Sequence, residues 1–321
     1  MNSVIVVGSF NVDHVWRCAE LPALGATIAG QYSTGPGGKG FNQAVAAARA
    51  GGQTAFVCAL GDDAGGALAR QLAGVDGIDL RAEPSDQPTG TAGIYVDARG
   101  RNSIVIGAGA NGTLGVSHVG ADPALLADAT VLLAQLESPV DTIEAALALA
   151  REAGVVTVLN PAPANAQSSI GLLRLADLLT PNETEFAALL ARHVGERIEA
   201  EQVAALDGAR LHALCRLLLP HGTVVVTLGS VGVFVSHAED QLRGDGQPYY
   251  RIGAESVTAS DTTGAGDAFN GALVAALARA PDAPFAAHVR YANRFAALST
   301  ERPGAAASMP DHAAVLERFG A

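Results

Sequence analysis

Short runs of Val, Ile and Leu alternate along the chain with longer stretches in which Ala and Leu recur at helical spacing. The short runs indicate buried strands, and the longer stretches indicate helices. Because strands that alternate with helices form a parallel sheet covered on both faces, the pattern predicts a doubly wound α/β fold with a mostly parallel central sheet. The predicted strands are residues 4–7, 55–60, 131–135, 155–159 and 224–228, and the predicted helices are residues 42–50, 64–73, 139–153, 183–191, 265–279 and 284–299.

Two parts of the chain depart from this alternation. Residues 12–35 contain no good helix, and residues 91–97 and 102–108 are strand-like segments on either side of a hairpin loop. Because neither part fits a βα unit, together they predict a small β-sheet lid, with two ordinary surface excursions as the alternative. The expected division is an α/β core of residues 1–11, 36–87 and 109–321 and a lid of residues 12–35 and 88–108.

Composition limits the partners of this chain. Hydrophobic residues make up 49% of its 321 residues and charged residues only 16%, which excludes a disordered chain. The net charge of −12, with no dense basic run, argues against nucleic acid as a partner. An anionic ligand would therefore have to be held by groups other than abundant Lys and Arg.

Several features predict a cytoplasmic protein. No stretch of about 18 apolar residues is free of Gly or charge, so no membrane helix is expected. The apolar run at residues 4–7 is too short for a signal peptide, and residues 1–3 carry no charged side chain. The three cysteines, Cys18, Cys58 and Cys215, are widely spaced and fit neither a disulfide framework nor a zinc site.

The strongest chemical signal is the segment DTTGAGDAFNG at residues 261–271, where small residues precede a long apolar helix. The first turn of a helix offers unpaired N–H groups, and Gly264, Ala265 and Gly266 let an anion approach that backbone closely. Asp267 would stand beside the anion and could accept a proton from an attacking hydroxyl. This combination predicts phosphoryl transfer to an alcohol, and the alternative is an ordinary helix cap.

A second glycine-rich segment, GPGGKGFNQ at residues 35–43, lacks the spacing of the Walker phosphate loop and of the dinucleotide fingerprint. Its glycines permit close approach to a small polar ligand, where Asn42 could bind hydroxyls and Lys39 could favour a phosphate. Asn11 and Asp13 follow the first strand, where a sugar could donate hydroxyls to them. A flexible loop and an Asx turn are the alternatives for these two segments.

Further polar residues follow other predicted strands. Glu137 lies after the strand at 131–135, and Thr227 and Gly229 lie where the strand at 224–228 ends in a glycine turn suited to nucleotide phosphates. Asn182 and Glu185 could organise waters around a Mg²⁺–phosphate unit, because Mg²⁺ keeps most of its waters. Each segment alone also reads as a loop or cap, but all belong at the crevice expected along the carboxyl ends of the strands.

These motifs resemble those of the PfkB-type, ribokinase-like sugar kinases. Residues 261–271 are similar to the C-terminal signature of that family and residues 37–51 to its N-terminal signature, and the resemblance extends from residue 8 to residue 308. It implies ATP-dependent phosphorylation of D-ribose at O5, with deoxyribose, a nucleoside or another sugar as alternative substrates. A sugar-sensing protein without activity and a Rossmann oxidoreductase are less favoured, because Asp267 is intact and no Gly-x-Gly-x-x-Gly turn follows the first strand.

The resemblance also implies a role for each matching residue. Asp267 would be the general base, and Gly264, Ala265 and Gly266 would form the anion hole. The lid would also pair two subunits into a homodimer. Phe41 stands where a small residue is expected, which predicts a reshaped sugar pocket. The implied sugar contacts are Asn11, Asp13, Gly38, Lys39, Asn42, Glu137 and Asp267; the implied ATP contacts are Asn182, Thr227, Gly229, Ser230, Gly232, Gly266 and Asn293; Glu185 would help to hold hydrated Mg²⁺, and Asp261, Thr263, Ser299, Arg302, Gly304 and Ser308 would surround an activating K⁺.

Overall fold

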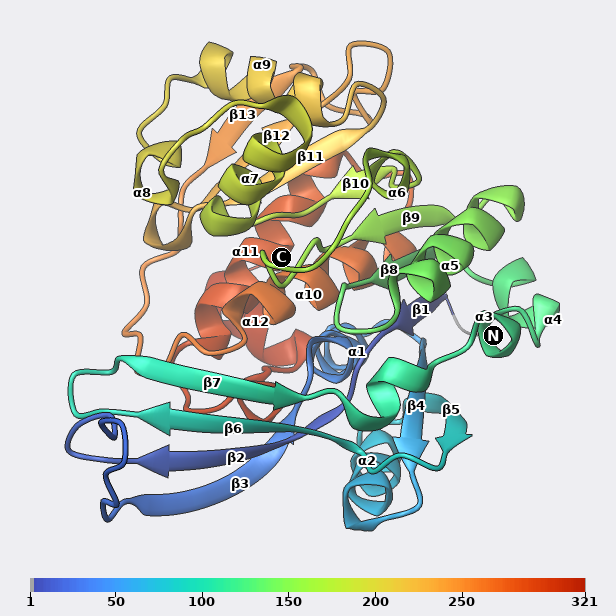
Figure 1. The fold of residues 1–321 in the computed structure, drawn as a ribbon. Coiled ribbons are helices and arrows are strands. Elements are labelled where there is room, and N and C mark those ends of the chain that lie inside the picture. The colour runs from blue at the N-terminus through green and yellow to red at the C-terminus, as the bar shows by residue number, and fades with distance from the viewer. Residues whose placement is uncertain (1–2, 321) are drawn as a thin grey trace.

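A nine-stranded sheet runs through the centre of the computed structural model, which describes residues 3–320 (Figure 1). Its strand order is β13-β12-β11-β10-β9-β8-β1-β4-β5, and all neighbours are parallel except the β11–β12 and β12–β13 pairs. The predicted doubly wound, mostly parallel α/β fold is therefore confirmed. The strands are β1 (Val4–Val7), β4 (Thr54–Gly61), β5 (Asp79–Ser85), β8 (Val131–Ala134), β9 (Val156–Leu159), β10 (Leu178–Leu179), β11 (Thr223–Thr227), β12 (Val233–Ser236) and β13 (Tyr249–Ile252).

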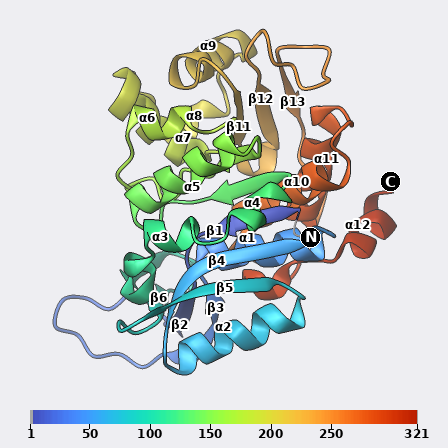
Figure 2. The same cartoon turned by 90° about the vertical axis from the view of Figure 1, so that its right-hand side faces the viewer.

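Helices cover both faces of this sheet, as Figure 2 shows with α5 and α7 on one side and α10 and α11 on the other. Val4 and Val6 of β1 face one apolar cluster, and Ile5 and Val7 face another, because side chains alternate along a strand. The first cluster includes α1 (Lys39–Arg49), α2 (Ala64–Val75), α10 (Ala265–Arg279), α11 (Phe285–Ser299) and α12 (His312–Phe319); the second includes α5 (Val140–Glu152), α6 (Ile170–Arg174), α7 (Glu183–Leu189), α8 (Ala200–Val203) and α9 (Gly208–Leu218). The shorter helical segments are η1 (Gly109–Thr113), α3 (Val116–Val119), α4 (Pro123–Ala127), η2 (Leu190–Val194), η3 (Gly229–Val231) and η4 (Ala306–Ser308).

A separate four-stranded sheet extends from the core at the lower left of Figure 1. Its order is β3-β2-β6-β7, in which β2 and β6 are parallel and the other two pairs are antiparallel. Two stretches far apart in the chain therefore build one sheet, as the sequence predicts. The strands are β2 (Asn11–Arg17), β3 (Gln31–Gly37), β6 (Gly90–Val96) and β7 (Asn102–Gly107).

All strands and helices expected in the core are present, and their ends shift by three residues or fewer. The expectation at the extreme N-terminus, that no signal peptide is present, rests partly on residues 1–2, which lie outside the described residues. Among the helices of residues 3–320, none has the length and apolar character that a membrane crossing requires.

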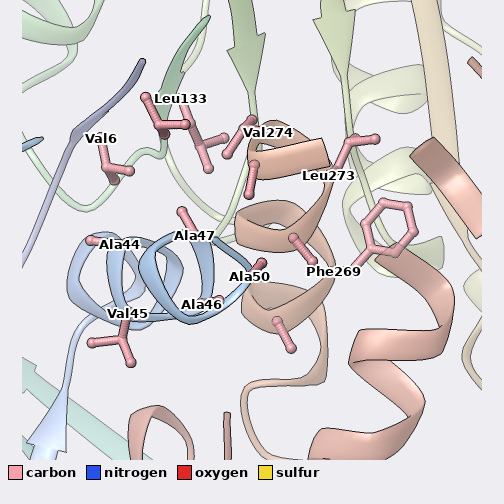
Figure 3. Packing of buried hydrophobic residues seen from close by; sticks show 14 of the residues in the cluster. Val6, Ala44, Val45, Ala46, Ala47, Ala50, Leu133, Phe269, Leu273 and Val274 are labelled. Atoms are coloured by element: carbon pink, nitrogen blue, oxygen red, sulfur yellow. The ribbon is translucent and has the colours of Figure 1, made fainter. Parts of the chain in front are cut away.

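The helices α1 and α10 pack unusually closely (Figure 3). A Cβ atom built on Gly271 of α10 would lie 2.5 Å from Ala46 Cβ and 2.8 Å from the Ala47 nitrogen of α1, which is closer than real atoms approach. The facing surface of α1 is accordingly made of fully buried alanines. Because both helices begin at the same edge of the sheet, this contact sets the distance between their first turns.

The close contact at Gly271 predicts that adding one methyl group there lowers the free energy of unfolding substantially. Gly271→Ala should destabilise the fold by about 1–3 kcal/mol, because the added carbon meets backbone that cannot move aside. The matched control is Gly74→Ala in α2, where a Cβ would meet nothing within 4 Å. That variant should gain about 0.5–1 kcal/mol from helix propensity. Urea unfolding measures both, and equal midpoints for the two variants would contradict the close-packing argument.

Candidate functional site

A cavity of about 160 Å³ opens where the central strands end and α10 begins. Asn160 follows β9, Thr180 follows β10 and Thr227 ends β11, so the cavity lies along the carboxyl edge of the sheet. This is the position at which open α/β sheets bind ligands. The lining residues are Lys39, Asn160, Ala162, Thr180, Asn182, Glu185, Thr227, Thr262, Gly264, Ala265, Gly266, Asp267 and Asn270.

Asp267 is a buried carboxylate in the first turn of α10, and two amides of α1 hold it in place. Asn42 Nδ2 donates to Asp267 Oδ2 over 2.9 Å, and Gln43 Nε2 donates to Asp267 Oδ1 over 2.8 Å. Burial raises the pKa of Asp267 above its usual value, while Lys39, Gln43 and Asn42 oppose that rise. A carboxylate with a raised pKa and a fixed orientation is suited to accept a proton.

The backbone beside Asp267 provides unpaired donors. The N–H groups of Gly266 and Asp267 have no hydrogen-bond acceptor among residues 3–320, and both lie in the first turn of a helix. Gly264, the residue before the helix, has φ 77°, and a Cβ there would lie 2.9 Å from Ala305 Cβ. Glycine is needed at Gly264 for both reasons. The three small residues thus leave a helix N-terminus open to an anion.

The amide network around Asp267 leaves two buried oxygens without a partner among the described residues. Gln43 Nε2 donates to Asn160 Oδ1 over 3.0 Å as well as to Asp267. The two oxygens are Asn42 Oδ1 and Oε1 of Gln135, whose amide nitrogen donates to Gln43. An unpaired buried acceptor is costly, so it marks a place where a ligand hydroxyl or a water would donate.

Glu137 fixes the glycine-rich segment that precedes α1. Its Oε2 accepts the backbone N–H of Lys39 at 2.9 Å and the Ser9 hydroxyl at 2.6 Å. Gly38 stands before the helix with φ 88°. A Cβ on Gly37 would overlap the Asp13 carboxylate, so this glycine makes room for Asp13. The conformation of the glycine-rich segment thus depends on its contacts with Glu137 and Asp13.

The site concentrates negative charge around one lysine. Burial, together with Glu137 and Asp267, raises the pKa of Asp13 to about 7. Burial disfavours the charge of Lys39, but the carboxylates of Asp267, Glu137 and Glu185 hold its pKa above the usual value. Such mutual repulsion costs stability, and clusters of this kind are typical of functional sites.

The structure shows the surroundings of Asn11 and Phe41, which the sequence alone does not reveal. Asn11 Oδ1 accepts from Asn111 Nδ2 over 2.8 Å, and Asn111 also holds the backbone of Phe10. Phe41 is 1% exposed and packs in the core, 5.0 Å from the Phe10 ring centroid and 6.0 Å from that of Phe56. Its ring is not in the lining of the first cavity, and the reshaping of the sugar pocket by Phe41 stays a prediction.

A second cavity of about 270 Å³ adjoins the first and shares part of its lining. It contains most of the residues expected at the nucleotide, and Ser230 is the exception: it lies in η3 and lines neither cavity. The lining residues are Asn182, Glu183, Thr227, Gly229, Gly232, Val233, Thr262, Ala265, Gly266, Phe269, Asn293 and Ala296.

Asn182 and Glu185 form a reciprocal cap at the start of α7. The Glu185 N–H donates to Asn182 Oδ1 over 2.8 Å, and the Asn182 N–H donates to Glu185 Oε2 over 2.9 Å. Burial raises the pKa of Glu185, with the Asn182 N–H and Lys39 opposing the rise. Both residues line the first cavity, so the cap also fixes a carboxylate at its wall.

The residues expected at a monovalent cation lie in two connected segments. Asp261 accepts the Thr263 N–H at 3.0 Å and the Gly304 N–H at 2.9 Å, which joins the loop before α10 to the segment after α11. Against the effect of burial, these donors hold the pKa of Asp261 below its usual value. The hydroxyls of Ser299 and Ser308 donate to carbonyls of their own segment. Arg302 lies in the same segment, between α11 and η4, and is exposed.

Several polar residues of the site were not predicted from the sequence. Asn160, Thr180 and Asn270 line the first cavity, whereas the other three hold neighbouring residues by hydrogen bonds. For Asn160 and Thr180, the signal was available, because each follows a buried strand. The unassigned residues are Ser9, Gln43, Asn111, Asn160, Thr180 and Asn270.

Comparison with known proteins places the chain in a family. The pfkB family carbohydrate kinase model matches residues 1–312, so the chain belongs to that family, whose members are phosphotransferases that act on an alcohol group. It is 38% identical to the ribokinase of Haemophilus influenzae over 320 residues, which cover 98% of this chain and 97% of that protein. It is 36% identical to the mouse ribokinase over 315 residues, which cover 96% and 92%.

Solved structures of ribokinases are similar to this chain over nearly its whole length. A ribokinase from Giardia lamblia superposes with a TM-score of 0.86 at 31% identity, covering 99% of this chain and 100% of that one. A ribokinase from Arabidopsis thaliana, complexed with ribose and ATP, superposes with a TM-score of 0.82 at 30% identity, covering 98% of both chains.

The raised pKa of Asp13 predicts a pH-dependent cost to stability. The pKa is about 7 in the folded chain and about 3.9 in an unfolded one, so the folded state binds the proton more tightly and loses stability as pH rises between these values. Asp13→Asn removes that loss. Its melting temperature should exceed that of the wild type at pH 8 and approach it at pH 4.5. An exposed control, Asp86→Asn, should show no such trend, and a pH-independent difference for Asp13→Asn would contradict the assignment.

Proposed function

We propose that this chain is a ribokinase, which transfers the γ-phosphoryl group of ATP to O5 of D-ribose. One observation carries the proposal: a buried carboxylate, Asp267, is held beside two unpaired backbone N–H groups at the start of α10. A base next to an anion hole is what phosphoryl transfer to an alcohol requires. The relatives named as ribokinases support ribose as the sugar.

Asp267 acts as the general base. Its orientation is fixed by Asn42 and Gln43, so one carboxylate oxygen receives the O5 proton as the oxygen attacks the γ-phosphorus in line. The N–H groups of Gly266 and Asp267 stabilise the charge on the transferred group. Gly264 and Ala265 carry little or no side chain that could cover this backbone.

The sugar lies beside the glycine-rich segment. Asp13 in its ionised form accepts two vicinal hydroxyls, and the unpaired Oδ1 of Asn42 accepts another. Glu137 acts mainly through the backbone that it fixes. Asn11, Gly38 and Lys39 complete the set of sugar contacts. Deoxyribose is the alternative substrate with direct support, because the chain is 30% identical to a deoxyribokinase of Salmonella typhi over 322 residues. A nucleoside or another sugar is a further alternative.

ATP occupies the second cavity and reaches the first. The Glu185 carboxylate at the wall of the first cavity would hold hydrated Mg²⁺, and the loop that carries Asp261 would hold K⁺. When bound, these ions neutralise phosphate charge. The proposed ATP contacts are Asn182, Thr227, Gly229, Ser230, Gly232, Gly266 and Asn293, and the proposed K⁺ site consists of Asp261, Thr263, Ser299, Arg302, Gly304 and Ser308.

The small sheet acts as a lid over the sugar and as the interface of a homodimer, in a cytoplasmic enzyme. Ile104, Val105 and Ile106 of β7 are 50%, 67% and 49% exposed, an apolar strand that a second subunit would cover. The proposed lid comprises residues 12–35 and 88–108, and the remaining segments, 1–11, 36–87 and 109–321, form the core.

Removing the charge of Asp267 tests its role. Asp267→Asn keeps the shape of the side chain but cannot accept the proton, so kcat should fall on the order of 10²–10⁴-fold. A coupled assay of ATP consumption with ribose measures the loss. Calorimetry of ribose binding and the Asp86→Asn variant serve as controls for folding. A variant that keeps more than a tenth of the activity would remove Asp267 from the role of base.

A panel of sugars tests the substrate. D-Ribose should give the highest kcat/KM among pentoses, hexoses and nucleosides, with and without K⁺. 2-Deoxy-D-ribose should be poorer by about 10–100-fold, because a buried acceptor loses its donor. If deoxyribose or a nucleoside is preferred, ribose is wrong while the family assignment remains.

A further inference from the structure

A second side of the central sheet, where the amino ends of its parallel strands lie, contains a cavity that the proposed reaction does not use. Its volume is about 210 Å³. Val131 and Val156 are the first residues of β8 and β9, so the cavity lies at the amino ends of strands whose carboxyl ends lead to the active site. Leu277 of α10 and Phe285 of α11 complete mainly apolar walls. Such walls suit the apolar body of a small molecule.

Arg243 is the one side chain with a permanent charge in the lining of this cavity. Its Nε donates to Thr223 Oγ1 over 3.1 Å and its Nη2 to the carbonyl of Asp177 over 3.3 Å, both neutral acceptors. Within residues 3–320 it forms no ion pair, and Nη1 has no acceptor. Burial lowers the pKa of Arg243, with Asp177 opposing the fall. Arg243 is half-buried and no carboxylate of the described residues contacts it directly, so its guanidinium is available to pair with an anion.

The backbone of Arg243 is also unusual. Its φ of 52° lies in the left-handed region, and no other residue except glycine has a positive φ in the part of the chain that the structure describes. Its carbonyl accepts the N–H of Phe285 over 3.1 Å, which ties it to the start of α11. An unfavourable conformation that the surroundings maintain is a reason to look for a role.

The acids nearest to this cavity have other partners. Asp177 is 2.9 Å from Arg151, and the Asp245 carboxylate accepts from Tyr250, His237 and the Ala286 N–H. No Asp or Glu lines the cavity, whereas a second basic residue, His288, does. Burial lowers the pKa of His288, so the cavity combines apolar walls with one permanently charged side chain, Arg243.

We propose that this cavity binds a small organic anion, in which one carboxylate or phosphate group pairs with Arg243 and an apolar body contacts Leu277, Phe285 and Val156. The site is separate from the proposed kinase reaction and does not depend on it. If the cavity is only a gap in packing, no such ligand will saturate it.

Calorimetry and thermal shift with benzoate and phenyl phosphate test the proposal, and benzyl alcohol serves as the uncharged probe. At least one anion should bind the wild type saturably, and benzyl alcohol should not. Arg243→Gln should weaken binding about tenfold or more. Ala283→Leu, which fills the cavity without changing Arg243, should abolish it and decides the matter if Arg243→Gln does not fold. The preferred anion shows whether carboxylate or phosphate is the natural group.

Two controls locate the binding. Arg70→Gln removes an exposed cation of α2 that does not line the cavity and should leave affinity unchanged. Asp267→Asn alters the active site and should also leave it unchanged, which separates this cavity from the anion hole of α10. Absence of saturable binding of both anions to the wild type, or equal affinity in the wild type and Ala283→Leu, would overturn the proposal.

Discussion

The contact between α1 and α10 determines the geometry of the candidate active site. Asp267 and Gly271 are four residues apart and therefore lie on the same face of α10. Figure 3 shows α10 packed on the alanines of α1. At Gly271 the distances leave no room for a side chain. Asn42 and Gln43 are consequently held within hydrogen-bond distance of Asp267, although 225 and 224 residues separate them in the chain. Helix packing thus fixes the orientation of the Asp267 carboxylate before a substrate arrives, as the proposed role of general base requires.

The same arrangement explains how a chain with a net charge of −12 can hold phosphate. The donors at the start of α10 are backbone N–H groups, which carry partial charge and need no basic side chain. Lys39 is the one lysine or arginine in the lining of the first cavity, and the surrounding carboxylates keep it charged. Acidity of the whole chain thus argues against nucleic acid but not against a nucleotide.

Local sequence patterns predicted the fold more completely than the site. The helix Ala265–Arg279 was predicted with its observed bounds, because small residues mark its start and a long apolar run follows. In contrast, β10 has two residues, too few for a periodicity, and β5 contains a proline at an edge of the sheet, so neither was predicted. Asp267, Asn42 and Lys39 belong to recognisable motifs. Gln43 and Asn111 gain their importance from partners more than 100 residues away, and only the topology supplies those.

The carboxyl ends and the amino ends of the parallel strands differ in how they can hold an anion. At the carboxyl edge, helices begin, and their free N–H groups face a ligand, so small residues such as Gly266 suffice there. At the amino edge, helices end and present carbonyl groups, which repel an anion. An anion site at the amino ends therefore requires a cationic side chain. Arg243 lies there, near the start of β9 and the end of α10, and forms no direct ion pair within residues 3–320. The polarity of a parallel α/β fold thus accounts both for an anion site made of backbone and for the need of an arginine at the opposite edge.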